Sequence, residues 1–393
     1  MKLNVAVFMG GKSCEHEISC ISAHQAIEAL DKEKYEIIPV YISKNNDLYT
    51  GEALLDLANF YDLEELKKKL SKVTIYKDNN KTYLKPVNGI FSKTKAIDVA
   101  FPVVHGTNVE DGSLAGFFEM MDLPYTSSNV LGSAIGQDKA IMKEVFEYEN
   151  IPILNWFYFY EKDYKENRKE LLEKAEKIGY PLVLKPANLG SSIGIEVIHN
   201  ENEFDEKVKE AFSYDFKLVV EKMVEKLKEV NISVFGNIEE AQCSVIEEVV
   251  KNDELLSFKD KYEGGSKSSK KLTLPTKGSK GMASTSRKVP ADLTSEQEEL
   301  IKTYALKAFK ALNANGVVRI DFIIDDKKKK NSIYINEINT IPGSLAFYLW
   351  NELKIDFTKE CDFLIKNALK MYRAKEKKTY SFDTNILDSY RRK

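Results

Sequence analysis

Carboxylate and amide side chains recur at a spacing of two residues in the segment from Val317 to Gly343. Arg319 and Asp321 alternate with apolar residues in a first extended run, and Glu337 and Asn339 follow in a second. Such alternation places polar side chains on one face of each strand. Mg²⁺ prefers hard oxygen ligands and keeps substrate phosphates in its remaining positions. The segment therefore predicts a magnesium site, although an ordinary hairpin with its polar face in water has the same pattern.

The polar run around Lys328 is typical of a hairpin connection, so the second strand should return antiparallel to the first. With the turn centred there, Arg319 is predicted to lie opposite Glu337, and Asp321 opposite Ile335. These positions would share one face, where a bound cation relieves the repulsion between the carboxylates.

A second candidate site is the loop 188–194, which lies between two β-type runs. Gly190 and Gly194 allow backbone amides to approach a ligand closely, the serines add donors, and Lys185 supplies a positive charge. These features predict a loop that holds phosphate groups. A glycine-containing surface hairpin is the alternative.

The longest irregular segment, 258–293, is rich in glycine, serine, lysine and proline. A stretch of this length without regular structure is usually a functional lid or a linker. Its lysines favour a lid that folds over phosphates, and a solvated linker is the alternative. Directly after it, Thr294 and Gln297 form a capping-box signature for a helix.

Length and composition narrow the class of protein. The 393 residues suggest two or three domains, and a net charge of -3 gives no support for binding to nucleic acid or an anionic membrane. We find no signal peptide and no membrane-spanning run. The four cysteines lack CxxC or zinc spacing, which indicates reduced thiols and a cytoplasmic location.

The usual nucleotide-binding fingerprints do not match. The run Gly10–Ser13 mimics the end of a P-loop, but alanine stands at position 6, and no GxGxxG is present. Apolar strands at 3–9 and 36–42 flank a helical pattern at 18–30, which predicts a parallel α/β sheet at the start of the chain.

Several motifs in order resemble the D-alanine–D-alanine ligases of the ATP-grasp superfamily over nearly the whole chain. They are GGKSCEHEIS from Gly10, HGTNVEDGSLAGFFEMMDLPYTSS from His105, QDKAIMK from Gln137, KPANLGSSIGI from Lys185, EKMVEKLKEVNISVFG from Glu221, KGSKGMASTSRKVPADL from Lys277, and RIDF followed by NEINTIPG from Asn336.

The resemblance implies an α/β fold of the ATP-grasp type. Its parts would be an N-terminal substrate-binding parallel α/β domain (1–127), a central ATP-grasp lobe (128–225), a C-terminal ATP-grasp lobe (226–375) with the lid at 258–293, and a polar tail (376–393). It also implies a cytoplasmic homodimer that contributes to peptidoglycan synthesis.

The implied chemistry is a ligation driven by ATP. The carboxylate of a first D-alanine would take the γ-phosphoryl group, and the amine of a second D-alanine would attack the acyl phosphate. Residues matched to the metal, Mg²⁺ or Mn²⁺, are Asp321, Glu337 and Asn339; a monovalent cation is a further candidate cofactor. Residues matched to ATP are Lys139, Lys185, Gly190, Ser191, Ser192, Glu221, Glu229 and Lys261.

The remaining matched residues concern the amino acids. Catalytic positions are Glu15, Ser191, Tyr262, Arg319 and Gly343, and substrate-binding positions are Glu15, His105, Arg319, Gly343, Tyr348 and Leu349. Without the resemblance, Glu15 could simply charge a helix N-terminus, and Glu221 and Glu229 could be surface glutamates.

One departure concerns the second substrate. The well-known branch of the family has a Ser-Leu pair at Tyr348 and Leu349, where it holds the second carboxylate. A tyrosine there changes the pocket, so D-serine or another amino acid is an alternative second substrate. The alternative from a different functional class is a regulatory protein that binds ATP but catalyses no reaction.

Overall fold

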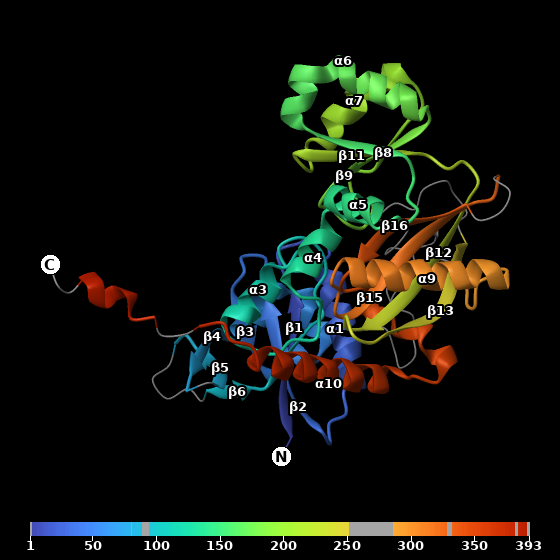
Figure 1. Ribbon diagram of the computed structural model, residues 1–393. Helices are drawn as coiled ribbons and strands as arrows, with labels where there is room; N and C mark the ends of the chain where they lie inside the picture. Colours follow the sequence, from blue (N-terminus) through green and yellow to red (C-terminus); the bar gives the residue numbers. More distant parts are fainter. Residues whose placement is uncertain are drawn as a thin grey trace.

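The computed structural model describes residues 2–79, 81–88, 94–250, 286–327, 332–381 and 384–390. Lys261, Tyr262 and nearly all of the expected lid lie outside them. Three sheets organise the chain, and Figure 1 shows the second one standing above the other two. In the described residues no helix is long and apolar enough to cross a membrane.

The first sheet has the strand order β6-β5-β4-β3-β2-β1-β7, and β1 pairs in parallel with β2 and β7. Its elements are β1 (Leu3–Gly10), α1 (His16–Ala29), β2 (Tyr35–Ile42), β3 (Leu48–Thr50), η1 (Glu52–Leu55), η2 (Leu57–Tyr61), α2 (Leu63–Lys68), β4 (Ser71–Asp78), β5 (Lys81–Pro86), β6 (Lys95–Ile97), β7 (Val99–Pro102) and α3 (Ser113–Met120). The parallel β-α-β opening predicted from the sequence is confirmed. Strand β1, which lies between β2 and β7, is buried on both faces from Val5 to Gly10, as parallel strands are when helices cover them.

The second sheet, of order β10-β9-β11-β8, is antiparallel. Its region contains α4 (Val130–Gln137), α5 (Lys139–Tyr148), β8 (Trp156–Tyr160), α6 (Glu161–Ile178), β9 (Leu182–Pro186), β10 (Glu196–Ile198), α7 (Glu201–Ala211) and β11 (Lys217–Lys222). Alternation along β11 turns Leu218 and Val220 to the core with α6 and α7, and turns Val219 and Glu221 to the other face. Lys185 pairs with Val219, so it shares the face of Glu221.

The third sheet has the order β14-β13-β12-β15-β16. Its elements are β12 (Leu227–Gly236), β13 (Ala241–Val250), β14 (Ser286–Lys288), α9 (Ser295–Ala311), β15 (Gly316–Asp325) and β16 (Ile333–Asn339); η3 (Gly343–Leu349), η4 (Asn351–Leu353), α10 (Phe357–Glu376) and η5 (Ile386–Tyr390) follow. The predicted capping box at Thr294 and Gln297 is confirmed. Apolar residues of β15 pack beneath α9, which leaves Arg319 and Asp321 on the opposite face.

The predicted hairpin register is wrong. Arg319 pairs with Asn339, and Asp321 pairs with Glu337, whereas Phe322 pairs with Ile335. The described pairs nearest the turn are shifted by one residue from the prediction, and a bulge then adds an extra residue to β16. As a result the two acidic residues are direct neighbours across the hairpin.

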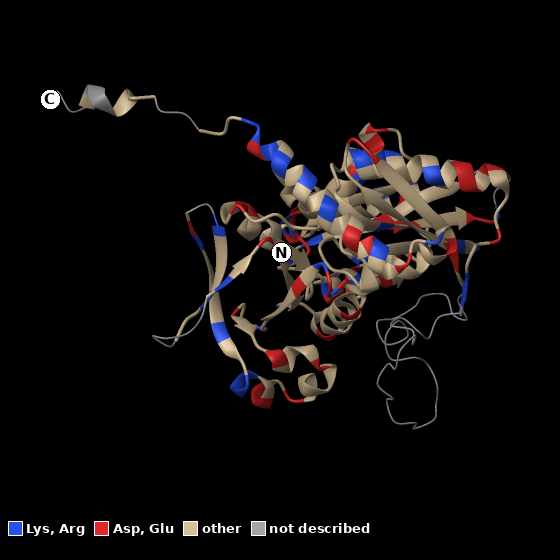
Figure 2. Ribbon diagram, turned by 90° about the horizontal axis from the view of Figure 1, so that it is seen from below, with Lys and Arg blue, Asp and Glu red and all other residues tan. Residues whose placement is uncertain are grey.

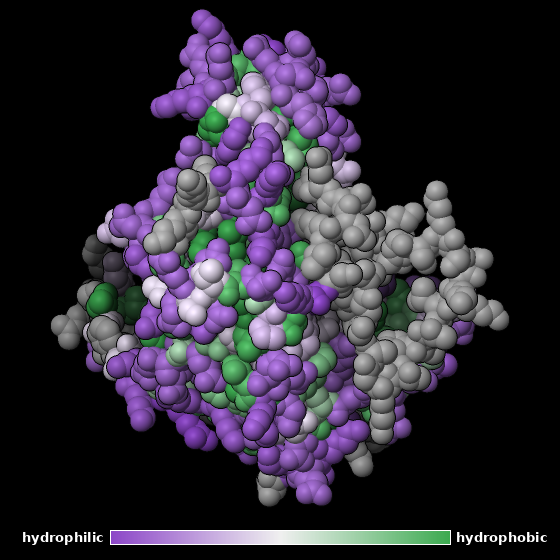
Figure 3. Space-filling model, turned by 90° about the vertical axis from the view of Figure 1, so that its right-hand side faces the viewer, coloured by the Kyte–Doolittle hydropathy of each residue, from purple (hydrophilic) through white to green (hydrophobic). Residues whose placement is uncertain are grey.

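Charged residues are spread over the described helices and strands, and Figure 2 shows positively and negatively charged residues interspersed along the ribbon. Figure 3 shows a mostly hydrophilic upper lobe on a wider body. The three sheets of the described residues are consistent with three structural units. The domain boundaries given above stay a prediction.

Candidate active site

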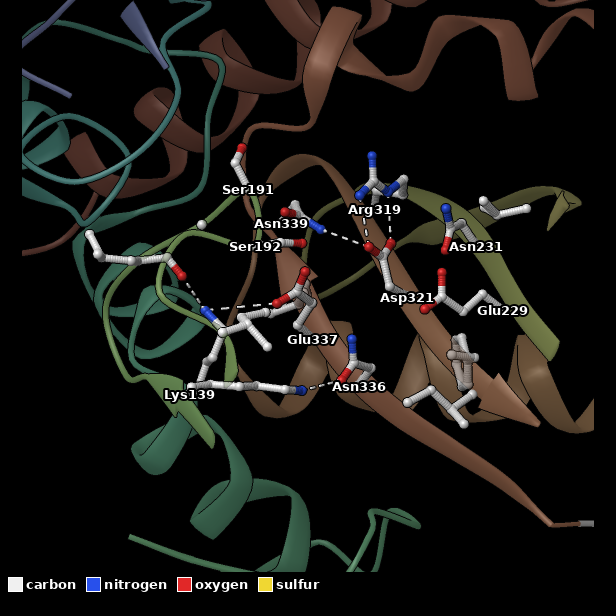
Figure 4. A pocket seen from close by; sticks show the side chains of 18 of the residues that line it. Lys139, Ser191, Ser192, Glu229, Asn231, Arg319, Asp321, Asn336, Glu337 and Asn339 are labelled. Atoms are coloured by element: carbon white, nitrogen blue, oxygen red, sulfur yellow. Dashed lines mark hydrogen bonds and ion pairs between the residues drawn. The ribbon is translucent and has the colours of Figure 1, made fainter. Parts of the chain in front are cut away.

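A cavity between the second and third sheets is lined by most of the predicted site residues. They come from the β1–α1 connection, the segment after β7, the start of α5, β9, the 188–194 loop, β11, β12, β15, β16 and the start of η3. Fourteen predicted residues line it: Glu15, His105, Lys139, Lys185, Gly190, Ser191, Ser192, Glu221, Glu229, Arg319, Asp321, Glu337, Asn339 and Gly343. Figure 4 shows Asp321, Glu337 and Asn339 facing the same space as Lys139.

The acidic face of the cavity consists of neighbouring side chains from β15 and β16. Both oxygens of Asp321 accept hydrogen bonds of 2.7 Å from the Arg319 guanidinium, and Asn339 Nδ2 donates weakly to Asp321 at 3.4 Å. Burial alone would lower the pKa of Arg319, but Asp321 raises it above its ordinary value, so the group stays charged. Asp321 thus already holds a cationic partner.

These residues fit a hard divalent cation. Asp321, Glu337 and Asn339 offer two carboxylates and one amide oxygen from adjacent strands, which suits an ion that keeps phosphate oxygens among its ligands. Among the described residues, no group of three or more His, Cys, Asp or Glu is arranged to hold a metal ion. An ion at Asp321 would share that carboxylate with Arg319.

Two lysines from the region of the second sheet, Lys139 at the start of α5 and Lys185 on β9, approach this acidic face. Lys139 Nζ donates to the backbone oxygen of Leu189 at 2.6 Å and lies 3.8 Å from Glu337. Lys185 Nζ donates to Asn336 Oδ1 at 2.9 Å. Both amines therefore lie where they could neutralise phosphate groups placed between the lobes.

A buried cluster of alternating charge holds one of these lysines. Glu221 lies 3.1 Å from Lys185 and 3.2 Å from Lys143, and all three are buried. Burial would raise the pKa of Glu221, but the two lysines hold it below its ordinary value. Burial lowers the pKa of Lys143 despite Glu221. Our sequence analysis missed Lys143, although its i,i+4 spacing from Lys139 on α5 was a usable signal.

The 188–194 loop brings its serine to Glu15. The Ser191 hydroxyl donates a hydrogen bond to the Glu15 carboxylate, and Ser191 and Ser192 have positive φ of 55° and 61°. Two glycines border the same carboxylate: a Cβ at Gly106 would lie 2.9 Å from Glu15 Oε2, and one at Gly190 would lie 3.1 Å from it. A side chain added at either glycine would therefore have to displace the Glu15 carboxylate.

His105 and Glu110 form the buried floor beside Glu15. His105 Nδ1 lies 2.8 Å from the Ile341 backbone oxygen, and Nε2 lies 3.0 Å from Ser22 Oγ. Burial lowers the pKa of His105, which favours a neutral ring that orients the backbone. Glu110, which the sequence analysis also missed, accepts hydrogen bonds from backbone amides; burial and nearby Glu15 raise its pKa to about 7.

Four predicted residues are not among those that line the cavity. Lys261 and Tyr262 lie outside the described residues, so the lid pair stays a prediction. Leu349 is fully buried, and the Tyr348 hydroxyl donates a 2.9 Å hydrogen bond to Glu247. Their assignment to the second substrate also stays a prediction.

Comparisons with known proteins identify relatives over almost the whole chain. The family described as D-ala D-ala ligase N-terminus matches residues 4–128, and D-ala D-ala ligase C-terminus matches residues 145–366. A D-alanine–D-alanine ligase of Thermosipho melanesiensis is 38% identical over 387 residues, which are 98% of each chain. One of Chloroherpeton thalassium is 38% identical over 379 residues, covering 94% of this chain and 97% of the relative.

Solved structures agree with the sequence relatives. The D-alanine-D-alanine ligase of Coxiella burnetii has a TM-score of 0.78 at 28% identity and 96% coverage of each chain. A D-Ala:D-Ser ligase of Enterococcus faecalis has a TM-score of 0.75 at 27% identity, covering 94% of this chain and 100% of that chain. The fold is therefore that of the ATP-grasp enzymes, and the chain belongs to the D-alanine–D-alanine ligase family.

Proposed function

We propose that this protein joins two D-alanines into D-alanyl-D-alanine at the expense of ATP, through an acyl phosphate, for peptidoglycan precursor synthesis. A carboxylate is a poor electrophile, so an amine attacks it only after its oxygen has become a phosphate leaving group. The proposal rests mainly on one observation: Lys139 and Lys185 face the acidic residues Asp321 and Glu337 across a single cavity.

The nucleotide would lie between the second and third sheets. Glu229 and Glu221 would bind its adenosine end, while Lys139, Lys185 and the amides of the loop with Gly190 and Ser192 would bind its phosphates. Charge on the transferred phosphoryl group is stabilised by positioned cations more than by covalent chemistry. Lys261 of the lid would add a further positive charge.

A divalent cation, Mg²⁺ or Mn²⁺, would be held by Asp321, Glu337 and Asn339. Such an ion would supply positive charge that neutralises the phosphate groups of ATP. The residues themselves keep this position acidic, because Asp321 and Glu337 lie opposite each other on adjacent strands.

The first D-alanine would be held at the Glu15 end of the cavity. Glu15 would pair with its ammonium group, and the Ser191 hydroxyl and Tyr262 of the lid would fix the Glu15 carboxylate. Arg319 and the backbone amide of Gly343 would stabilise the oxyanion formed when the second amine attacks. His105 would support this end as a neutral hydrogen-bonding ring.

A ligase with D-serine as the second substrate is the second candidate. It is supported by the structural similarity to the D-Ala:D-Ser ligase of Enterococcus faecalis and by tyrosine at position 348. The two candidates differ only at the amine donor, because both require the same activation of a first D-alanine.

The test is product analysis with purified protein, ATP and Mg²⁺. D-Alanine, D-serine and L-alanine are supplied singly and in pairs, ADP release is followed, and the dipeptides are identified by mass. We expect D-alanyl-D-alanine as the main product from D-alanine. Preferred D-alanyl-D-serine from the mixture would select the second candidate, whereas exclusive use of L-alanine, or ATP binding without any product, would reject both.

The proposal also covers the oligomeric state of the protein and its location in the cell. We expect a homodimer in the cytoplasm, with no nucleic acid or membrane as partner. Sedimentation of the purified protein at micromolar concentration tests the dimer. Parallel assays with Mn²⁺ in place of Mg²⁺, and with and without K⁺, test the divalent and monovalent cations.

A further inference from the structure

Three donors converge on one carboxylate at the edge of the cavity. Glu247 has no exposed surface. Its Oε1 accepts hydrogen bonds from the Tyr348 hydroxyl at 2.9 Å and from Asn231 Nδ2 at 3.1 Å, and its Oε2 lies 3.1 Å from Arg287 Nη1. A buried carboxylate is stable only when such partners satisfy it, so these residues form one fixed unit.

Strand pairing places this unit on the face that carries the acidic site. Asn231 of β12 pairs with Glu247 on one side and with Asp321 on the other, so Glu247 lies two strands from Asp321 on the same face. Arg287 of β14 pairs with Val249, which lies two residues beyond Glu247 and shares its face. Arg287 and Asn231 line the same cavity as Arg319 and Gly343.

The tyrosine and the arginine have different roles in this unit. Burial and the nearby Glu247 carboxylate raise the pKa of Tyr348, so its hydroxyl stays protonated and donates a hydrogen bond to Glu247. The centre of the Arg287 guanidinium lies 4.9 Å from the centroid of the Tyr348 ring, at which distance a cation is attracted to an aromatic face. Tyr348 thus supports Arg287, and of these two side chains it is Arg287 that lines the cavity.

We propose that Arg287, positioned by Glu247 and Tyr348, binds the α-carboxylate of the amine-donating second amino acid and thereby selects amino acids over uncharged analogues. The inference rests on the proposed ligase function. Arg319, which donates to both oxygens of Asp321 through Nε and Nη2, is assigned to the oxyanion, so a different cation would hold the substrate carboxylate. A guanidinium has five N–H donors in a planar fork, and it can serve Glu247 and a ligand carboxylate together.

The test compares two amine donors that differ only in their charge. Wild-type protein and Arg287→Met receive ATP, Mg²⁺ and an equimolar mixture of D-alanine and D-alaninamide, and the ratio of D-alanyl-D-alanine to its amide is measured by mass. We expect Arg287→Met to lower this ratio by roughly 10- to 100-fold, the effect of losing one charged hydrogen-bonding partner. The KM for ATP should change by less than about threefold, because the ATP-binding residues are untouched.

Matched variants separate binding from structural damage. Lys288→Met removes a positive charge from the neighbouring, largely exposed position of the same strand and should leave the product ratio unchanged. Tyr348→Phe should slow turnover but keep the ratio within about threefold of wild type, since Arg287 remains.

The opposite pattern, with the ratio lost in Tyr348→Phe and kept in Arg287→Met, would assign the carboxylate to the tyrosine and overturn the inference. A raised KM for ATP with an unchanged ratio would also overturn it, because Arg287 would then serve the nucleotide. If wild-type protein formed no dipeptide, the proposed function itself would fail and this inference would fall with it; dipeptide formation with an unchanged ratio in Arg287→Met would reject the inference alone.

Discussion

The buried charge cluster of Glu221, Lys143 and Lys185 makes a sharp prediction about stability. At 3.1 to 3.2 Å, each Glu221–lysine attraction is about 5 kcal/mol for an effective dielectric constant near 20, before the cost of burial is subtracted. Glu221→Gln leaves two lysines close together without a counter-charge. We therefore expect it to lower the free energy of unfolding by about 3–5 kcal/mol.

The lysine variant should behave differently. In Lys143→Met, Glu221 still has Lys185 as its partner, and the cost of burying one ammonium group disappears, so we expect a loss of only about 0–2 kcal/mol. In the Glu221→Gln background, Lys143→Met removes a repulsion between lysines. The double variant should accordingly be more stable than Glu221→Gln alone by about 1 kcal/mol or more.

Urea and thermal unfolding of the four proteins, followed by circular dichroism, measure this cycle. Glu221→Gln should lower Tm by roughly 4–6 °C if the chain unfolds as one unit. The control is Glu161→Gln, which breaks the exposed pair with Lys165 at 2.7 Å and should change stability by less than about 0.5 kcal/mol. If Lys143→Met were equally destabilising in both backgrounds, the lysines would not share Glu221 and the reasoning would be refuted.

Three further predictions follow from the site. Raising the pH from about 4.5 to 7 should lower the stability of wild type relative to Glu110→Gln by roughly 3 kcal/mol. The reason is that the raised pKa of Glu110 makes the folded state retain a proton that the unfolded state releases. Urea titrations of both proteins across this pH range measure the difference in stability, and a difference that stays constant would contradict the prediction. Gly106→Ala should cost about 1–3 kcal/mol and raise the KM of the first amino acid, since its φ is +85° and its Cβ would meet Glu15, whereas the control Gly116→Ala, whose Cβ would make only an ordinary contact with Val130 at 3.9 Å, should not destabilise. Asp321→Asn should reduce ADP release by at least about 100-fold at saturating Mg²⁺; full activity in that assay would remove Asp321 from the metal site.

The identities of the site residues could be predicted because each stands in a short motif, but their mutual positions could not. Alternation along one strand correctly placed Arg319 and Asp321 on a common face. The partner of each depends on the turn and on a bulge that adds one residue to β16, and neither has a sequence signature in this hairpin. Hence Asp321 was predicted opposite Ile335 and instead lies opposite Glu337.

Contacts between strands that are far apart in the sequence could not be predicted, for a related reason. Glu247 and Arg287 belong to strands joined by a long segment, and nothing in their local pattern indicates that they pair next to each other. Tyr348 was predicted at the second substrate because its motif position is known, yet its hydroxyl meets Glu247. A buried polar partner of this kind is found only when the fold places a second side chain beside it.

The cations of the cavity are held in position by the protein's own oxygen atoms. Lys139 donates to the backbone oxygen of Leu189, and Lys185 is held by Asn336 and by buried Glu221. Each amine has therefore lost much of its water and its conformational freedom during folding rather than during ligand binding. A phosphate that arrives between the lobes then meets ordered cations in a poorly hydrated space, where electrostatic stabilisation is stronger than in bulk water. Because the holding oxygens of Lys139 and Lys185 come from both lobes, the spacing of the lobes and the position of the positive charge are set together.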